Sequence, residues 1–290
     1  MHVHSYFSGP CTTPVVGAFC RESYSDPEEV LETLQRREMN LFTLTDHDSI
    51  EGSEKLRRHP HFFLSEELTC RMPSGTEVHI GVYDFHERQH VQLQQRRNDL
   101  PALLMYLTER QLFFSINHVF SSLTGRRELE DFGWFEEYFP AMETRNGQML
   151  AKANAQAARL ARRWRKTGIG GSDGHALASV GKTYTHVAGA VTKQQFFDGL
   201  REGRGRVHGE SGCVAKLTRD VFLIAGEMMR EKWWTMLLAP LAVALPVATY
   251  LNYRDEGAFL RRWSAEVMDQ GNRDRVRWAS VPNPAVEEWA

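Results

Sequence analysis

The chain has 290 residues, which is long enough for one large domain with an appendage and for a substantial buried core. Hydrophobic residues make up 42% and charged residues 25%, an ordinary composition for a soluble globular protein, and the net charge of -2 gives no general attraction to nucleic acid. The four cysteines form no C-x-x-C pair, which favours a reduced, cytoplasmic setting. The start, Met-His-Val-His, lacks the basic and apolar regions of a secretory signal peptide, so none is expected.

Short apolar runs alternate with amphipathic stretches over the first two thirds of the chain. Residues 26–29, Asp-Pro-Glu-Glu, are typical of an N-cap, a proline at the first helical position and an acidic first turn. A helix is therefore expected to begin there and to end near residues 36–37. The next apolar run, 41–44, is typical of a buried parallel strand and stops at the polar residues 45–48.

The same order recurs along the chain. Further strands are expected at 62–64, 78–83, 113–116 and around Ile169, and further helices at 100–110 and 148–166. This alternation predicts an α/β barrel or a doubly wound sheet. Each polar cluster directly follows an apolar run, and the carboxyl ends of strands in an α/β barrel meet on one face. Residues far apart in sequence can therefore form one site.

The composition changes from about Cys213 onward. Residues 233–253 contain no charged side chain, and this length matches the roughly 20 residues that span a bilayer. Pro240 and Pro246 are tolerated in a membrane helix but are awkward in a continuous soluble one. Two interpretations stay open: a membrane-spanning or membrane-associated segment, or two short helices that pack on the barrel and bend at the prolines.

Histidines and acids coincide with the expected strand ends. His2 and His4 are two residues apart, which places both side chains on one face of an extended strand, and Asp173 and His175 share this spacing. Imidazole and carboxylate ligands suit zinc, manganese or iron, and a carboxylate such as Glu67 can bridge two ions. The remaining histidines lie in polar contexts and are interpreted as solvated: His59, His61, His86, His90, His186 and His208.

These clusters resemble, in order, the successive motifs of the PHP (polymerase and histidinol phosphatase) superfamily. The motifs are His2-Val3-His4-Ser5, Leu44-Thr45-Asp46-His47-Asp48, Glu67, His79, Asn117-His118 and Gly171-Ser172-Asp173-Gly174-His175. The resemblance covers roughly residues 1–212 and implies a distorted seven-stranded (β/α) TIM-like barrel, followed by a short helical C-terminal appendage over 213–290. It also implies two or three divalent metal ions (Mn²⁺, Zn²⁺ or Fe²⁺) and hydrolysis of phosphomonoesters or phosphodiesters.

The resemblance also implies a distribution of ligands over three metal positions. The first would take four side chains: His2, His4, Glu67 and Asp173. Glu67 would bridge to the second position, completed by His79 and His118, and the third would take His47 and His175. Asp46 and Glu143 are expected to hold ligand histidines in the correct tautomer. His47, His175 and Asp46 are the candidate catalytic residues, since His47 or His175 would protonate the leaving group if the third position were empty.

Substrate binding is predicted for Arg145 and Asn146, because an arginine fork matches the geometry of a phosphate. The chain departs from the family pattern at Gly9, where members usually have an aspartate that helps to hold the third metal. An insertion, about Cys11 to Ser25, follows and is expected to supply a substitute or a substrate loop, with Asp26 better explained as a helix cap. The family's short strand before the first motif is also missing, so either that strand is truncated or the start lies upstream.

The leading hypothesis is a metal-dependent phosphoesterase acting on a small phosphorylated molecule or a nucleotide, in the cytoplasm or at the inner face of the membrane. No strong nucleic-acid signature is present. A different class also stays open: a metal-binding barrel that has lost catalysis and serves as a membrane-attached or interaction module. A third hypothesis is metal-dependent hydrolysis of C–N bonds, although no metal-bridging lysine is evident at an expected strand end.

Overall fold

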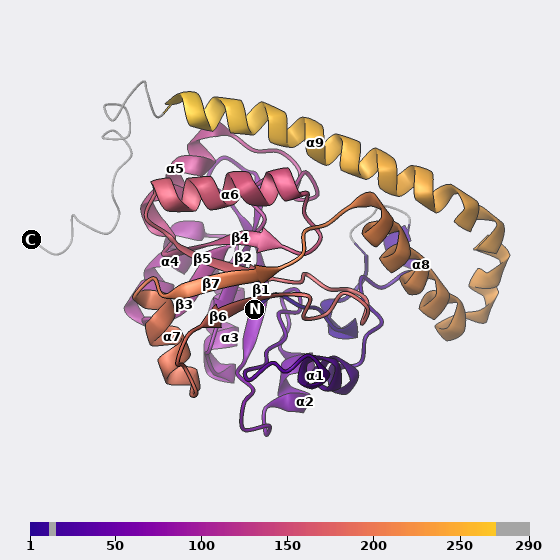
Figure 1. Cartoon of the computed structure of the whole chain (residues 1–290), viewed down its shortest axis with the longest axis horizontal. Helices are drawn as coiled ribbons and strands as arrows, with labels where there is room; N and C mark the ends of the chain where they lie inside the picture. Colours follow the sequence, from indigo (N-terminus) through magenta and orange to yellow (C-terminus); the bar gives the residue numbers. More distant parts are fainter. Residues whose placement is uncertain (12–15, 271–290) are drawn as a thin grey trace, which may run out of the picture.

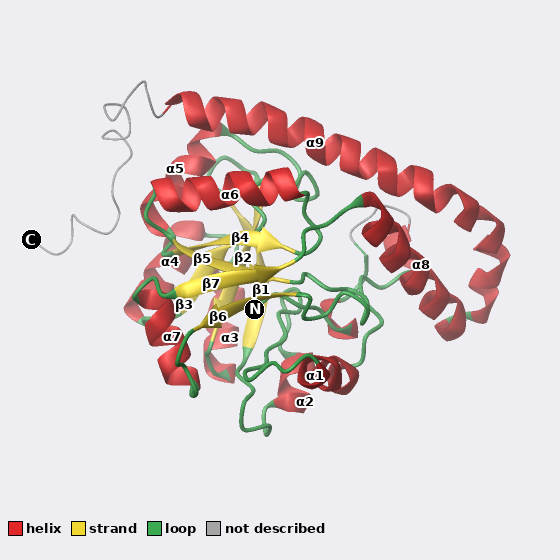
Figure 2. Cartoon of the chain, viewed as in Figure 1, coloured by secondary structure: helices red, strands yellow, loops and turns green. Residues whose placement is uncertain are grey.

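Helices surround a mixed sheet in the computed structural model of the chain, which describes residues 1–11 and 16–270 (Figure 1, Figure 2). Five strands follow one another across this sheet in sequence order: β1 (Ser65–Arg71), β2 (Glu77–Tyr83), β3 (Phe113–Ile116), β4 (Ala141–Asn146) and β5 (Thr167–Gly171). The predicted α/β class is confirmed. The parallel arrangement expected of a barrel holds only for β3, β4 and β5, since β1 pairs antiparallel with β2 and β2 with β3.

The connection between β1 and β2 explains the first antiparallel pair. Residues 72–76 form a tight turn in which Met72 N donates to Thr76 O at 2.8 Å. Gly75 adopts φ 84°, a left-handed conformation that glycine reaches without steric cost. Parallel neighbours need a crossover of a dozen or more residues, so this short turn dictates a hairpin. A second hairpin, β6 (Thr183–Val187) and β7 (Gly205–Gly209), contacts β5.

The predicted seven-stranded barrel is found only in part, because the regular sheet of the described residues is open between β1 and β5. Two N-terminal segments are joined to these edges by isolated bridges and single hydrogen bonds. Residues 1–5 bridge the end of β5 through Val3 and Gly174, and residues 42–47 bridge β1 through His47 and Glu67. Thr45 N donates to Val3 O at 2.9 Å and so connects the two segments.

The apolar run 41–44, predicted as a buried strand, forms no regular strand. Its one bridge joins Phe42 to Phe62 in parallel. A side chain replaces part of the backbone ladder here, because the Thr45 hydroxyl accepts a hydrogen bond from Val3 N at 3.0 Å. The run is nevertheless buried, and Phe42 and Leu44 belong to a small apolar cluster beneath helix α1 (Pro27–Arg36).

The helices expected from sequence are confirmed. Helix α1 begins after Asp26, whose side chain accepts from Glu28 N at 2.8 Å, so Asp26 is a helix cap. Helix α4 (Leu100–Glu109) occupies the range predicted for it, and α6 (Ala151–Arg163) lies within the predicted range 148–166 but is shorter at both ends. The remaining helices of the α/β part are α2 (Glu51–Leu56), α3 (Glu87–Arg96), α5 (Leu129–Tyr138) and α7 (Lys193–Arg201).

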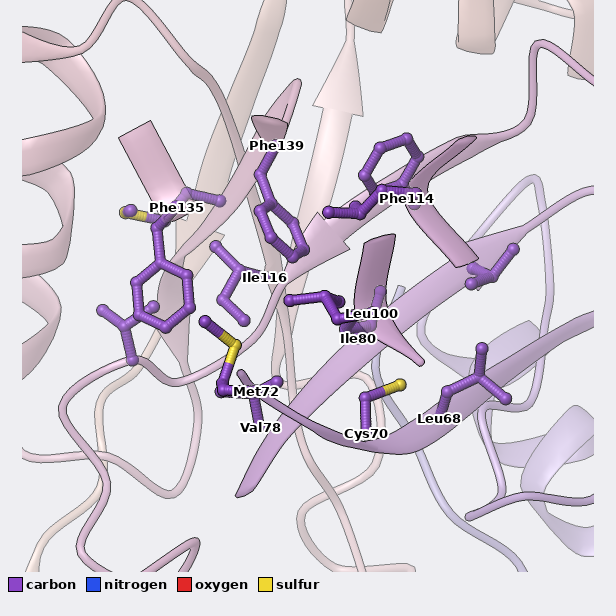
Figure 3. Close-up of a cluster of buried hydrophobic side chains, with 14 of the residues drawn as sticks. Leu68, Cys70, Met72, Val78, Ile80, Leu100, Phe114, Ile116, Phe135 and Phe139 are labelled. Atoms are coloured by element: carbon purple, nitrogen blue, oxygen red, sulfur yellow. The ribbon is translucent and has the colours of Figure 1, made fainter. Parts of the chain in front are cut away.

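Alternation along β1 to β3 separates the hydrophobic core from the polar face. Alternate side chains on these strands pack against the helices with Phe135 and Phe139: Leu68, Cys70, Val78, Ile80, Phe114 and Ile116 (Figure 3). Fully burying one such aliphatic or aromatic side chain contributes about 1.5–3 kcal/mol. The intervening residues, such as Glu67 and His79, point to the opposite face because successive strand residues alternate. The apolar pattern therefore sets the direction of the polar side chains.

The C-terminal appendage consists of α8 (Val214–Glu231), a 3-10 helix η3 (Trp233–Ala244) and α9 (Leu245–Gln270). The second half of α9 packs on the α/β part, since Leu260, Trp263 and Val267 are buried in the main core (Figure 1). Pro240 lies inside the 3-10 helix and Pro246 in the first turn of α9, so the prolines coincide with the change of helix type. Residues 12–15 of the insertion and 271–290 of the appendage lie outside the described residues.

One helical stretch of the described residues, Trp233–Val267, is long and apolar enough to cross a membrane by length and composition, and only 11% of its most apolar window is buried. Large apolar side chains of this stretch are exposed, including Trp233 at 78%, Leu237 at 83% and Val243 at 82%. This exposure disagrees with the interpretation of residues 233–253 as two short helices that pack on the barrel.

Candidate metal centre

The eight predicted metal ligands come together in one cluster, although they span positions 2 to 175. Four groups of three have ligand atoms within 4.8 Å of one another: His2 with His4 and Asp173; His2 with Glu67 and His118; His47 with Glu67 and His79; His4 with His47 and His175. Glu67 and His79 lie within strands β1 and β2 rather than beyond them. The others come from the N-terminal segments and from the ends of β3 and β5.

The N-terminal segment packs closely enough to join the cluster because β5 ends in glycine. A Cβ atom at Gly171 would lie 2.2 Å from the Cβ of His2, a distance that real side chains do not reach. Asp173 N donates to His2 O at 2.8 Å and His4 N donates to Gly174 O at 3.2 Å. These bonds place His2, His4 and Asp173 beside one another.

The first group is buried and tightly spaced. His2 Nε2 and His4 Nε2 are 3.0 Å apart. Glu67 Oε2 lies 2.9 Å from the former and 3.4 Å from the latter, and Asp173 Oδ1 lies 3.4 and 3.2 Å from the same two atoms. Two imidazole nitrogens and two carboxylates thus surround one point, as expected for the first metal position.

The two oxygens of Glu67 face different sets of histidines. Oε2 faces His2 and His4, whereas Oε1 lies 3.3 Å from His118 Nε2 and 3.7 Å from His79 Nδ1. This division is the geometry that a carboxylate bridging two cations needs. Glu67 Oε2 is also 3.6 Å from His47 Nε2, so the third group adjoins the same carboxylate.

Sequence reasoning missed one residue beside His47 and His175, the two residues expected at the third metal position. The rings of His47 and His175 each stack on the ring of His4, with centroids 4.8 and 4.4 Å away. Glu22 Oε1 lies 3.3 Å from His175 Nε2, and Glu22 Oε2 lies 3.4 Å from His47 Nε2. Glu22 belongs to no regular strand, although the largely apolar residues 15–20 precede it. The available hints were this apolar stretch and an acid in the insertion that follows Gly9.

Hydrogen bonds to the far ring nitrogens set the tautomers of three histidines. His2 Nδ1 donates to Glu143 Oε1 at 2.8 Å, and His175 Nδ1 donates to the backbone O of Asp173 at 3.1 Å. His4 Nδ1 donates to Ser8 Oγ at 2.9 Å, and this hydroxyl donates in turn to Asp46 Oδ1. With the proton on Nδ1, the Nε2 lone pair of each ring points into the cluster, as metal binding requires.

The three remaining polar candidates have positioning contacts. The Asp46 carboxylate accepts from Ser5 N at 2.6 Å and from the hydroxyls of Ser5 and Ser8, so it acts on His4 through Ser8. Asn146 is buried, and its amide donates to Glu143 and Asp173 at 3.0 and 2.8 Å. The guanidinium of Arg145 donates to Gly209 O on β7 at 2.8 Å. These contacts do not support the predicted phosphate-binding roles of Arg145 and Asn146.

A second departure from the sequence interpretation concerns His90. Its Nδ1 lies 2.9 Å from Oε2 of the fully buried Glu66, although this histidine was expected to be solvated. Burial raises the pKa of Glu66, while His90 partly offsets that effect. The pair lies outside the ligand groups and has a structural role.

Burial and charge act in opposite directions on the acids of the cluster. Burial favours the neutral acid, but the surrounding histidines prevail and hold the pKa of Glu67 and of Asp173 well below their usual range. Glu22 behaves in the same way beside His47 and His175, and its pKa falls to about 2. Burial lowers the pKa of His4 to about 4. The acids are thus ionised and His4 neutral near pH 7, the forms that bind cations.

Several buried ligand atoms also lack hydrogen-bond partners within the described part of the chain. They include Glu22 Oε2, His79 Nδ1 and His175 Nε2, all of which face other members of the cluster. An unsatisfied buried polar atom costs about 1–3 kcal/mol, so a cation that these atoms bind would relieve a real penalty. The donor set fits divalent metal ions.

Two ligands also have unusual backbones. His118 and Asp173 adopt φ angles of 23° and 48°, in the left-handed region that side chains rarely occupy. Such conformations cost on the order of 1–3 kcal/mol each and persist where the surroundings enforce them. Glu143 Oε2 accepts from His118 N at 3.1 Å and Asn146 binds the Asp173 carboxylate, which are the enforcing contacts.

Comparisons with known proteins found one family model and several similar solved structures. A family model described as PHP-associated matches residues 151–204. PsfC from Pseudomonas syringae PB-5123 is similar in structure, with 18% identity, a TM-score of 0.52, and coverage of 79% of this chain and 97% of that one. A protein from Bifidobacterium adolescentis, predicted to be a metal-dependent phosphoesterase, shares 13% identity with a TM-score of 0.41, over 69% of this chain and 94% of the other. No curated protein matches the sequence.

The structural likeness to PsfC concerns the fold alone at this level of identity. The PHP-associated match over residues 151–204 adds to the ordered motifs from His2 to His175, which resemble those of PHP proteins. Together they support a PHP-domain protein.

Proposed function

We propose that the chain is a metal-dependent phosphoesterase that hydrolyses a phosphomonoester or phosphodiester of a small molecule or nucleotide. The observation that carries this proposal is the Glu67 carboxylate, whose two oxygens face separate histidine groups. Divalent ions bound there would lower the pKa of water toward neutrality and neutralise charge that develops on a phosphoryl group. Segments 1–5 and 42–47 would take the places of the two strands that β1 to β5 lack for a distorted seven-stranded barrel.

The exposure of the ligands supports access by a substrate from one side. His2, His4 and Glu67 form a floor, with side chains at most 1% exposed. His79, His118, Asp173 and His175 form a rim, with side chains 8% to 19% exposed. A phosphate ester reaching the rim would meet His47 and His175, which are placed to hold or donate a proton to the leaving oxygen.

The test is hydrolysis of p-nitrophenyl phosphate and bis(p-nitrophenyl) phosphate by the full chain loaded with manganese. We expect turnover by the wild type, none by His4→Ala or Glu67→Gln, and unchanged turnover by His186→Ala, because His186 is exposed on β6 away from the ligand groups. Activity that survives loss of both His4 and Glu67 would sink the mechanism. Metal retention without turnover would favour the alternative of a catalytically impaired binding module, and cleavage of amides alone would favour a C–N hydrolase.

We also propose that the exposed apolar segment attaches the protein to the surface of a membrane. Both ends of the segment are tied to the folded part: Lys232 Nζ donates to Phe19 O at 2.9 Å, and Tyr253 Oη donates to Gln148 O at 2.6 Å. A segment held at both ends on the same body favours lying in the interface over crossing the bilayer. Exposed tryptophans such as Trp233 are enriched at that interface.

A further inference from the structure

The third metal position differs from the other two in its charge. The first and second positions each include Glu67 or Asp173. The residues that the motifs assign to the third, His47 and His175, are both imidazoles, and the group that contains them is completed by a third imidazole, His4. Three neutral imidazoles leave the charge of a divalent ion uncompensated. A carboxylate at this position would restore the mixed donor set of the other two.

Glu22 is placed to supply that carboxylate. Its two oxygens lie 3.3 Å from His175 Nε2 and 3.4 Å from His47 Nε2. Oε2 is buried without a hydrogen-bond partner among the residues that the structure describes. It is therefore an acceptor with unused capacity, and the nearby Nε2 of His175 likewise has no hydrogen-bond partner among these residues.

Residues 9–11 pair with residues 20–22, which places Glu22 beside Gly9. Pro10 and Arg21 form an antiparallel bridge, Cys11 N donates to Cys20 O at 2.9 Å, and Glu22 N donates to Gly9 O at 3.1 Å. Gly9 itself adopts φ 86°, which would strain any residue with a side chain. An acid at position 9 would thus be unfavourable in this backbone, whereas position 22 reaches the same neighbourhood through the insertion.

The appendage secures the residues on the N-terminal side of Glu22. Arg21 Nε lies 3.0 Å from Glu231 Oε1, Lys232 Nζ donates to Phe19 O, and the rings of Phe19 and Trp234 are 6.0 Å apart. These three contacts join the insertion to the end of α8 and the start of η3. They connect a ligand of the centre to a part of the chain far outside it.

We propose that Glu22 is a ligand of the third metal ion and that residues 231–234 of the appendage position it. This inference rests on the proposed metal-dependent function but concerns ion count rather than turnover. It assigns the substitute for the missing aspartate to a residue of the insertion. It also gives the appendage a role in the centre, independent of any membrane.

The test measures manganese bound per chain by equilibrium dialysis and elemental analysis, on the full chain after chelation and reloading. We expect three ions in the wild type and two in Glu22→Gln, which keeps the size of the side chain and removes its charge. Glu231→Gln should retain the first two ions and bind the third roughly 10–100-fold more weakly, the usual effect of losing a residue that supports a ligand. Glu227→Gln, on the same helix and paired only with exposed Arg230, is the matched control and should bind three.

Three ions with unchanged affinity in Glu22→Gln, or only two in the wild type, would overturn the ligand assignment. A third ion bound normally in Glu231→Gln and in Trp234→Ala would overturn the positioning role. Thermal unfolding of each metal-free variant reports whether the variant folds. If Glu22→Gln is unstable, the surface variants Glu231→Gln and Trp234→Ala still test whether the third ion depends on the position of Glu22. Three bound ions without any phosphoester turnover would count against the proposed function and leave this inference intact.

Discussion

His2 and Glu143, 141 positions apart, are joined by a 2.8 Å hydrogen bond from the imidazole Nδ1 to the carboxylate Oε1. The bond fixes the tautomer of His2, so its Nε2 lone pair faces His4 and Glu67. The other oxygen of Glu143 accepts from His118 N. One buried carboxylate therefore orients ligands from two metal positions.

Glu143→Ala should weaken manganese binding roughly 10–100-fold, because the imidazole of His2 loses the partner that orients it. The metal-free protein should also lose about 1–3 kcal/mol of unfolding free energy, since the His2 Nδ1–H remains buried without an acceptor. Isothermal titration and urea unfolding measure the two effects. Glu136→Ala, an exposed acid on α5, should change neither. Normal metal affinity in Glu143→Ala would contradict the assigned role.

Ser8→Ala tests the contact between His4 and Asp46. The hydroxyl accepts from His4 Nδ1 and donates to Asp46, so its removal frees the His4 ring and leaves a buried carboxylate oxygen with one partner fewer. We expect a roughly tenfold weaker affinity for the most tightly bound ion. Competition with a chromophoric chelator measures that affinity. Ser264→Ala on α9 serves as the control, and equal affinities for the two variants would refute the role of Ser8.

The stability of the metal-free protein should fall on the alkaline side. Burial by itself lowers the pKa of His175. The negative charges of Glu22 and Asp173 outweigh this effect and raise the pKa to about 9, from an ordinary value of 6.5. A raised pKa gives stability that is complete below pH 6.5 and is lost as the pH rises through 9. Urea unfolding after chelation should show this decline, and His175→Gln should flatten it. A wild-type curve that is level from pH 6.5 to 9 would contradict the assigned pair.

Glu22 should produce a second, acidic decline. Its pKa is lowered from 4.5 to about 2, so its contribution is present above pH 4.5 and is lost as the pH falls toward 2. The difference in unfolding free energy between the wild type and Glu22→Gln should therefore shrink over that range.

Metal affinity should rise with pH, whereas the stability of the metal-free protein falls on the alkaline side. The reason is that manganese competes with protons for the histidines and binds more tightly as the pH rises.

Leu237→Asp together with Val243→Asp should abolish sedimentation with vesicles of phosphatidylethanolamine and phosphatidylglycerol. Both side chains are more than 80% exposed in the wild type, so the substitutions should leave thermal unfolding unchanged. Val191→Asp, at an apolar position 76% exposed elsewhere, should sediment with vesicles like the wild type. Failure of the wild type to bind vesicles would remove the membrane proposal without affecting the metal centre.

Local pattern was a good guide wherever a residue's role depends on its immediate neighbours. The cap at Asp26 and the ranges of α1, α4 and α6 followed from spacing and turn chemistry. The run 41–44 did not become a strand, because whether an apolar run forms a ladder depends on the partner beside it. Here that partner is the N-terminal segment, which bonds partly through the Thr45 hydroxyl.

The amino-acid sequence by itself indicated eight members of the cluster and their order along the chain. It did so through two-residue spacing, through positions at the ends of expected strands and through the resemblance of these motifs to the PHP pattern. Tertiary structure alone decided that Glu22 joins them and that Arg145 is directed to Gly209. An irregular loop has no periodicity to read, and its contacts depend on where distant segments bring it. The open sheet between β1 and β5 belongs to the same category, since it reflects how two short segments meet their neighbours rather than the pattern within either.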